Sequence, residues 1–259
     1  MKNLIHELAI IETGAQIGKN VTIGPWTYIS KDVVIGDNCH ISSHVVINGP
    51  TRIGTGNRIF QFASIGEDCQ DLKYAGEATE LIIGDNNTFR ECCTIHRGTI
   101  QDQGITAIGS NNLFMAYTHV AHDCMVGSHC IMANNASIAG HVHVGDHAIL
   151  GGMSGIHQFC HIGAHSFVAA NSLVVKDVPP YVMASGDSAK PFGLNSEGLK
   201  RRGFAKDTIS AIKKAYRMVY RQSLTVDEAL TKIDNELVES SELAQFTDFI
   251  KSSSRGIIR

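Results

Sequence analysis

Aliphatic residues recur at every sixth position through the first two thirds of the chain. An unbroken run begins at Ile5 and lasts to Ile65, and the next position is often glycine, as at Gly18. Four places after each aliphatic residue stands a small side chain, such as Val21 after Ile17. This period fits neither the 3.6-residue turn of a helix nor the two-residue alternation of a half-buried strand. It predicts short strands joined by turns and wound into a three-sided prism, with the large and the small residues both pointing inward.

The six-residue rhythm is interrupted twice. It resumes at Ile83 after a break near residues 71–82, and at Ile108 after a break near residues 101–107. Extra residues in a solenoid leave it as surface loops, often on the binding side. We therefore expect a β-helix over residues 1–190 with loop insertions at about 71–82 and 101–107. Each regular coil should take three hexads, or about 18 residues.

The hexads end at Val178-Pro179-Pro180-Tyr181, and the later hydrophobic residues are spaced as on helices. Asn195 or Ser196 can cap a first short helix, and Thr225 with Glu228 forms a capping-box sequence for another. The chain is thus predicted to be mainly β, with a C-terminal α-helical domain over residues 191–259.

Composition narrows the function class. The 259 residues carry a formal net charge of −3, which gives no global reason to bind nucleic acid. No stretch approaches the ~20 apolar residues of a membrane helix, and no signal peptide or anchor is visible, so we expect a cytoplasmic protein without an integral membrane segment. Between Lys190 and Arg221 lie nine basic residues, which form either a solvated helix face or a dock for an acidic partner.

The cysteines follow the repeat. Six of the seven occupy the small inward position, and only Cys92 does not. No Cys-x-x-Cys pair occurs, and adjacent cysteines do not have zinc-ligand spacing. We expect core side chains rather than disulfides or metal ligands.

The coil length brings polar residues together. The hexads that begin at Val120, Ile138 and Ile156 are one coil apart, so they should stack about 4.8 Å from one another on one face. Gly140 lies 18 residues after His122 and should therefore sit directly one coil above it, with an unshielded N–H. The polar side chains that these hexads and their neighbours carry are His119, His122, Asp123, His141, His157 and Gln158.

Such a histidine cluster suits either a metal or proton transfer. The γ-class carbonic anhydrases bind zinc on a similar prism, but they pair two ligand histidines five residues apart, whereas His119 and His122 are three apart. A neutral imidazole is also a suitable general base near pH 7. We favour the base and expect no metal.

Longer segments carry a more specific resemblance. They are Ala121-His122-Asp123-Cys124, Ala133-Asn134-Asn135-Ala136, Ala139-Gly140-His141, Ile156-His157-Gln158-Phe159, Gln70-Asp71-Leu72-Lys73-Tyr74, Pro191-Phe192-Gly193-Leu194-Asn195 and Glu197-Gly198-Leu199-Lys200-Arg201-Arg202. Together they closely resemble the UDP-N-acetylglucosamine acyltransferase family of hexapeptide-repeat enzymes, which act at the first step of lipid A synthesis. The resemblance implies a left-handed parallel β-helix, although the general preference for right-handed crossovers predicts the opposite hand.

The resemblance implies a reaction. A 3-hydroxyacyl chain would move from an acyl carrier protein thioester to the 3-hydroxyl of UDP-N-acetylglucosamine, without a cofactor because the thioester is already activated. His122 would be the general base, Asp123 can orient its ring, and Gly140 would bind the oxyanion.

Further roles follow from the same resemblance. Asp71 would contact the sugar, and His141, His157 and Gln158 would line the site. His119 is a substrate-binding candidate from its place beside the face that carries these histidines, and the second-shell roles of His119 and His161 are left open. The nucleotide would be held by Asn195, Glu197 and Arg202, and the donor by Lys73 and Arg201. Acyl length would be measured by Ala170, with Phe167 nearby.

A homotrimer with sites between protomers is also implied. Phe62, Phe114 and Tyr117 independently indicate association, because we interpret them as outward apolar residues. Three rivals stay open: a CoA-dependent acetyltransferase of the same fold, a structural β-helix, and the N-acyltransferase of the same pathway. The last usually has an extra domain before its repeats, for which a repeat starting at Ile5 leaves no room. Acyl length, 3-hydroxylation and a 3-amino acceptor analogue are left undetermined.

Overall fold

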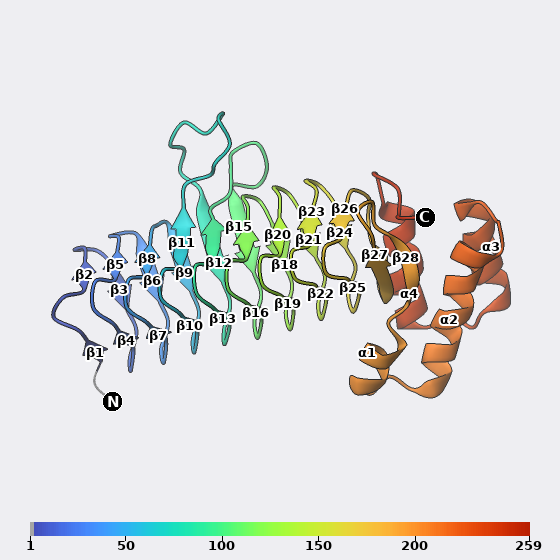
Figure 1. Cartoon of the computed structure of the whole chain (residues 1–259), viewed down its shortest axis with the longest axis horizontal. Helices are drawn as coiled ribbons and strands as arrows, with labels where there is room; N and C mark the ends of the chain where they lie inside the picture. Colours follow the sequence, from blue (N-terminus) through green and yellow to red (C-terminus); the bar gives the residue numbers. More distant parts are fainter. Residues whose placement is uncertain (1–2) are drawn as a thin grey trace.

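A computed structural model describes residues 3–259, in which three sheets form the faces of a long prism and helices close one end (Figure 1). Sheet A contains, in spatial order, β1 (Leu4–Ile5), β4 (Thr22–Ile23), β7 (His40–Ile41), β10 (Arg58–Ile59), β13 (Thr88–Phe89), β16 (Leu113–Phe114), β19 (Ile131–Met132), β22 (Ile149–Leu150), β25 (Phe167–Val168), β27 (Val182–Ser185) and β28 (Lys190–Leu194). Sheet B contains β2 (Ile10–Ile11), β5 (Tyr28–Ile29), β8 (Val46–Ile47), β11 (Ser64–Glu67), β14 (Thr94–His96), β17 (His119–Val120), β20 (Ser137–Ile138), β23 (Gly155–Ile156) and β26 (Leu173–Val174). Sheet C contains β3 (Gln16–Ile17), β6 (Val33–Ile35), β9 (Thr51–Ile53), β12 (Glu80–Ile83), β15 (Ile105–Ile108), β18 (Met125–Val126), β21 (His143–Val144) and β24 (His161–Ile162).

The coil length matches the prediction. Val120 pairs with Ile138, and Ile138 with Ile156, so neighbouring strands of coils without an insertion are 18 residues apart. The fold is a left-handed parallel β-helix. Residues 1–2 of the expected β-helix lie outside the described part of the chain.

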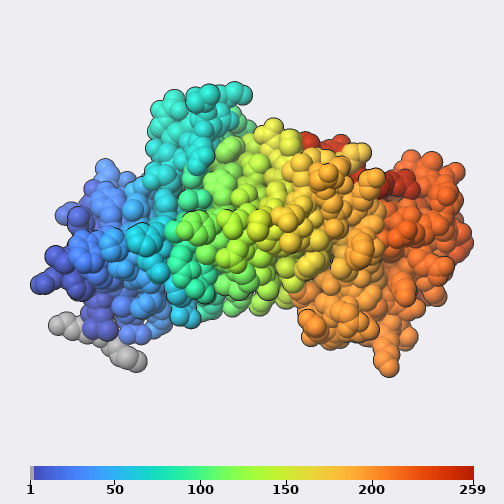
Figure 2. Space-filling view, in the orientation of Figure 1, coloured from blue at the N-terminus to red at the C-terminus, as the bar shows by residue number. Residues whose placement is uncertain are grey.

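The two insertions differ in extent from the prediction. They occupy residues 68–79 and 97–104, whereas the sequence placed them at about 71–82 and 101–107. The reason is that β12 and β15, which follow the insertions, begin two residues earlier than the usual two-residue strands of the prism and pair with each other over four residues. Both insertions rise from the same edge of the prism, and the first protrudes from its surface (Figures 1 and 2).

The predicted inward residues form the core. The side chains of Ile29, Ile65 and Ile138 are fully buried, as are those of small-position residues such as Ala136. All seven cysteines are free, six of them are buried, and Cys92 is partly exposed. The expectation of core cysteines is confirmed.

One outward assignment is wrong. Phe114 occupies the aliphatic position of its hexad, so it is fully buried and its ring stacks on that of Phe89 with centroids 4.8 Å apart. Phe62 and Tyr117 lie on turns and are 59% and 60% exposed, as expected.

The C-terminal residues form four helices within the described chain: α1 (Ser196–Arg201), α2 (Lys206–Arg221), α3 (Val226–Glu236) and α4 (Ser241–Ser252). Asn195 caps α1, and Thr225 with Glu228 completes a capping box on α3. β28 pairs antiparallel with β27 and crosses the expected boundary at residue 190. The chain then returns to the last coil, where the N–H of Ile258 donates to the carbonyl of Asp177 at 2.9 Å. Across residues 3–259, no helix has the length and apolar character that crossing a membrane requires.

Candidate active site

The predicted histidines gather at one edge of the prism, which we call the B/C corner because its turns lead from sheet B to sheet C. Each turn contains a residue in the left-handed conformation: Asp123 has φ 57° and His141, one coil on, has φ 61°. Aspartate and histidine adopt this conformation more readily than most residues. The turn therefore fixes the backbone of both residues and aims their side chains at the same corner.

His122 and Gly140 lie face to face. A Cβ atom added at Gly140 would lie 2.5 Å from Cε1 and 2.7 Å from Nε2 of the His122 ring. Only glycine leaves room for the ring at this place. Among the described residues, the N–H of Gly140 has no hydrogen-bond partner. The site therefore presents an imidazole and an unpaired amide side by side.

A buried carboxylate holds the His122 ring. Nδ1 of His122 lies 2.7 Å from Oδ2 of Asp123, whose side chain is fully buried. Asp123 also accepts hydrogen bonds from the N–H of Thr99 at 2.8 Å and the hydroxyl of Thr99 at 2.6 Å. Burial alone would raise the pKa of Asp123, but the hydrogen bonds from His122 and Thr99 outweigh it and bring the pKa below its ordinary value. Asp123 is thus ionised and draws the Nδ1 proton of His122, which leaves Nε2 as the basic nitrogen.

His141 joins the same cluster. Its ring is perpendicular to that of His122, with centroids 5.1 Å apart. Nδ1 of His141 lies 2.9 Å from Oδ2 of Asp102, and Nε2 lies 3.8 Å from Oδ2 of Asp123. Single ligand-type atoms of His122, Asp123 and His141 all fall within 4.8 Å of one another, a spacing that a metal could use. Both Nδ1 atoms already face carboxylates, however, which is the arrangement of an oriented base.

A pocket of about 460 Å³ extends from this corner across the outer surface of sheet B. Its lining includes Gln70, Asp71, His96, His119, Ala121, His122, Ser137, Ala139, Gly140, Gly155, His157 and Leu173. Burial lowers the pKa of His96 to about 4, and burial followed by the nearby His122 lowers the pKa of His119. The His96 ring is therefore neutral near pH 7 and the His119 ring is biased toward its neutral form, so Asp71 is the acidic group of the lining.

The first insertion reaches this pocket from a fixed base. The guanidinium of the buried Arg97 donates to the carbonyl of Gly66 at 2.5 Å, to the hydroxyl of Tyr74 at 3.1 Å, and to Asp68. These bonds fasten the loop whose Asp71 lines the pocket. Lys73, two residues on, is exposed and is not part of the lining.

The residues expected to hold the nucleotide lie elsewhere in a single chain. Asn195 donates to the carbonyl of His165 at 2.8 Å, and Arg202 donates to the carbonyl of His147 at 3.0 Å, both on the corner between sheets C and A. Glu197 is exposed and forms an ion pair with Lys200 at 2.7 Å. One chain does not bring this group together with the pocket on sheet B.

Other expected site residues are spread along the last coils. His157 lines the pocket, whereas Gln158 is exposed on the same turn. Phe167 stands on the outer side of sheet A, and Ala170 on the following corner, which leads from sheet A to sheet B. Leu173, three residues after Ala170, lines the pocket.

The sequence interpretation missed several residues of the site. His96 could have been found, because the pairing of Ile95 with Val120 places it one coil below Ala121 once the insertion is subtracted. Thr99 and Asp102 lie within the second insertion, and Arg255, whose Nη2 is 3.4 Å from Nδ1 of His157, lies in the C-terminal segment. Neither segment has a repeat from which a position could be read.

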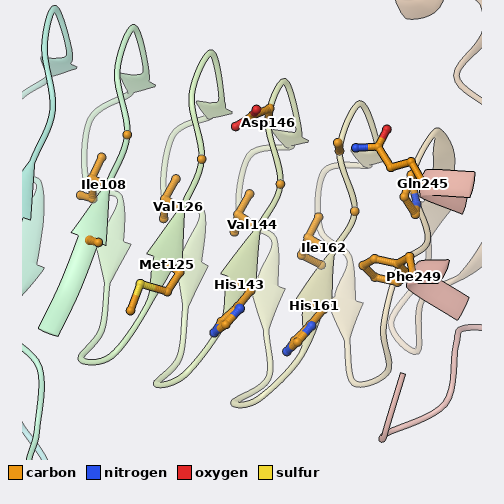
Figure 3. A pocket seen from close by; sticks show the side chains of 17 residues that line it. Ile108, Met125, Val126, His143, Val144, Asp146, His161, Ile162, Gln245 and Phe249 are labelled. Atoms are coloured by element: carbon orange, nitrogen blue, oxygen red, sulfur yellow. The ribbon is translucent and has the colours of Figure 1, made fainter. Parts of the chain in front are cut away.

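A larger groove, of about 680 Å³, lies on sheet C and is bounded by α4 (Figure 3). It contains the stacked rings of His143 and His161, 4.6 Å apart, and Phe249 of α4. Its carboxylate, from Asp146, accepts from the backbone N–H of Ser128 at 2.7 Å and pairs with no imidazole of the lining. The smaller pocket on sheet B therefore has the better case for catalysis.

A β-helix of hexapeptide repeats, with an oriented imidazole beside an unpaired amide in a groove, is the structure of a hexapeptide-repeat acyltransferase. Family models agree: residues 14–49 and 106–140 match the bacterial transferase hexapeptide repeat, and residues 177–258 match the second domain of UDP-N-acetylglucosamine O-acyltransferase. The chain belongs to the UDP-N-acetylglucosamine O-acyltransferase family.

Solved structures support this assignment over the whole chain. LpxA from Acinetobacter baumannii is 53% identical, with 99% of this chain and 100% of that chain covered and a TM-score of 0.96. UDP-N-acetylglucosamine O-acyltransferase from Moraxella catarrhalis is 52% identical, with 98% and 99% covered and a TM-score of 0.96. The Arabidopsis UDP-N-acetylglucosamine acyltransferase is 37% identical, with 99% and 100% covered and a TM-score of 0.87. The resemblance found in the sequence is confirmed.

Proposed function

We propose that this chain moves a 3-hydroxyacyl group from the thioester of acyl carrier protein to the glucosamine 3-hydroxyl of UDP-N-acetylglucosamine, the first step of lipid A synthesis. The observation that carries the proposal is the His122–Asp123 pair beside Gly140 at the end of a pocket, in a chain of this family. Acyl transfer to a hydroxyl needs a base for the hydroxyl proton and a donor for the carbonyl oxygen. The corner offers one of each.

In the proposed reaction, Nε2 of His122 takes the proton of the sugar 3-hydroxyl as that oxygen attacks the thioester carbonyl carbon. A C–O bond forms, and the negative charge that develops on the carbonyl oxygen is stabilised by the N–H of Gly140. The C–S bond then breaks, and the imidazolium of His122 returns the proton to the departing thiolate. A positioned base contributes roughly 10²–10⁴-fold, and an oxyanion donor roughly 10²–10³-fold.

Acceptor binding is assigned to the pocket and its rim. Asp71 would contact the sugar, with His119 and His157 of the lining around it and with His141 and Gln158 at the adjoining corner. Near neutral pH the lowered pKa of His119 favours an uncharged ring, which suits hydrogen bonds to sugar hydroxyls.

We further propose that the complete site forms between protomers of a homotrimer. Asn195, Glu197 and Arg202, proposed to bind the nucleotide, lie on a different corner from the pocket in one chain, so a second chain would have to supply them. An apolar column on the corner between sheets A and B supports association: Trp26, Phe62, Tyr117 and Met153 are each more than half exposed. His44, Cys92 and Asn135 stand between these residues on the same corner, and large apolar side chains that recur along one exposed edge favour a protein interface.

The donor is proposed to dock on the basic tail. Lys206, Lys213, Lys214 and Arg217 are exposed on α2, and Arg201 is exposed at the end of α1. A strongly acidic carrier protein would be attracted to this surface, and Lys73 of the first insertion is proposed to assist. Ala170 and Phe167 are proposed to limit the acyl chain. The seven free cysteines suit a reducing compartment, and we propose the cytoplasm.

The direct test is mass-spectrometric detection of UDP-sugar acylation with a series of acyl carrier protein thioesters, with acetyl-CoA as the competing donor class. We expect product with a 3-hydroxyacyl thioester, and we expect the folded His122→Ala variant to lose at least 100-fold in kcat. Product only from acetyl-CoA would reject the donor assignment. Near-normal turnover by the variant would reject the base assignment.

A further inference from the structure

We propose that the second insertion, residues 97–104, is a positioning loop in which Thr99 and Asp102 hold the two imidazoles of the site. The inference rests on the proposed function and adds two residues to it. Neither lines the pocket; each would act through a histidine, Thr99 by way of Asp123 and Asp102 directly on His141.

Thr99 completes the binding of a fully buried carboxylate. Its N–H donates to Oδ1 of Asp123 at 2.8 Å, and its hydroxyl donates to Oδ2 at 2.6 Å. Thr99 is itself only 2% exposed, so water does not compete for these bonds. A buried carboxylate stays ionised only when donors replace its lost hydration. Thr99 supplies two of the three hydrogen bonds, and His122 supplies the third.

The ionisation state of Asp123 decides which nitrogen of the neutral His122 ring carries the proton. An ionised Asp123 accepts the Nδ1 proton of His122, so the neutral ring has its lone pair on Nε2, the nitrogen beside Gly140. A carboxylate that has lost a donor takes up a proton more readily and holds its own orientation less firmly. Thr99 therefore helps to set both the tautomer and the direction of the base.

Asp102 orients the ring of His141. Its carboxylate lies 2.9 Å from Nδ1 of His141, and the two groups are 39 residues apart in the chain. This contact fixes a ring that stands perpendicular to His122, with Nε2 3.8 Å from Asp123. The ring also stacks on Phe159 with centroids 4.4 Å apart, so Asp102 sets the position of Nδ1 on a ring that is already held on one face.

The insertion is built to be rigid at Thr99. The N–H groups of Asp102 and Gly104 both donate to the carbonyl of Thr99, at 3.3 and 3.0 Å. A Cβ at Gly98 would meet the backbone N of Ile105 at 2.2 Å, so the loop closes tightly on itself there. Arg97, just before, is buried and bound to the carbonyl of Gly66. The insertion thus supplies the two side chains, Thr99 and Asp102, that bond Asp123 and His141 at this corner.

Thr99→Val tests the inference, because it removes the hydroxyl donor and keeps the side-chain shape and the backbone N–H. We expect kcat to fall about tenfold or more, with KM for the nucleotide sugar changed less than about threefold. Thr99→Ser should restore most of kcat. Thr79→Val is the matched control: Thr79 is a buried threonine of the first insertion whose hydroxyl has no hydrogen-bond partner, so kcat should not change.

The pH profile separates positioning from folding. With His122 neutral, the His122–Asp123 pair has one net negative charge, and with His122 protonated it has none. A donor to the carboxylate favours the first state, so Thr99→Val should move the acid limb of kcat/KM to higher pH. The titratable groups around the pair are His96, His119, His141, Asp102 and Cys69. Asp102→Asn, at a partly exposed site, should lower kcat several-fold without shifting the melting temperature.

The outcomes are distinct. Wild-type protein that acylates no UDP-sugar rejects the proposed function itself. Active wild type with Thr99→Val unchanged in kcat and in acid limb rejects the positioning loop. Equal loss in Thr99→Val and Thr99→Ser together with a large drop in melting temperature assigns Thr99 to folding alone, and also rejects the inference.

Discussion

Gly140 offers the sharpest test of the site geometry, because a single added methyl group at this position would collide with the His122 ring. In Gly140→Ala, the added Cβ would lie 2.5 Å from Cε1 of His122, whereas carbon atoms pack at about 3.5 Å. The ring must therefore withdraw by about 1 Å, which strains its 2.7 Å contact with Asp123. A misplacement of this size in a reacting group can cost about 100-fold in rate.

The substitution separates the proposed base, His122, from the proposed oxyanion donor, the N–H of Gly140. Alanine keeps the N–H at position 140, and Gly140 is not among the glycines with a positive φ, so the backbone conformation suits alanine. We therefore expect kcat to fall about 100-fold through His122, with a melting temperature close to that of the wild type. Gly193→Ala in β28, where a Cβ meets nothing within 4 Å, is the matched control and should keep full activity.

A double variant gives the decisive measurement. If the methyl group acts by displacing His122, then Gly140→Ala should cost nothing more in a His122→Ala background, because the clash is gone. Steady-state kcat and KM for the four proteins of this cycle, measured by mass spectrometry, provide the coupling. Turnover of Gly140→Ala within about threefold of wild type would refute the proposed geometry, and full additivity in the cycle would refute the route through His122.

Four further outcomes are expected. Ala170→Gly should shift preference toward longer acyl chains, measured as relative kcat/KM over a thioester series; an unaltered profile contradicts the measuring role. Charge reversal of Arg201 and Lys206 should raise KM for the carrier-bound donor and weaken its salt dependence, whereas an unchanged, salt-insensitive KM contradicts docking on the tail. Phe62→Glu should reduce the assembled mass seen by light scattering, because it puts a charge into the apolar column; a wild-type mass argues against that contact. Burial lowers the pKa of His96 from the ordinary histidine value of about 6.5 to about 4, so the full stability of the folded chain is present above pH 6.5 and is lost as pH falls toward 4. Chemical unfolding should therefore show a loss of up to ~3 kcal/mol from this group, which His96→Gln removes; an identical pH dependence in that variant contradicts it.

The repeat made much of this molecule predictable. In a solenoid each coil contacts mainly its neighbours, so a distance along the chain converts directly into a position in space. Once the coil is 18 residues long, His122 must lie under Gly140, and the small-position cysteines must point inward. Phe114 follows the same rule: it occupies the aliphatic position of its hexad, which predicts a core residue, and it is buried. Its assignment to the outside neglected that position.

The positions of residues in the two insertions and in the C-terminal segment could not be predicted in this way, because these segments have no repeat. Thr99 and Asp102 approach Asp123 and His141 because the loop folds back on itself, and no period encodes that path. The extended strands β12 and β15 likewise shifted the loop boundaries through pairing between coils.

The sequence alone therefore determined the β-helix, its core and the juxtaposition of a histidine with a bare glycine, because these depend on a local repeat that winding turns into a regular lattice. Only the tertiary structure decided which side chains of the second insertion hold Asp123 and His141, and which polar groups stay apart in one chain. Those features depend on non-repeating segments whose paths are fixed by contacts distant in sequence, such as Arg97 with Gly66 and Arg202 with His147.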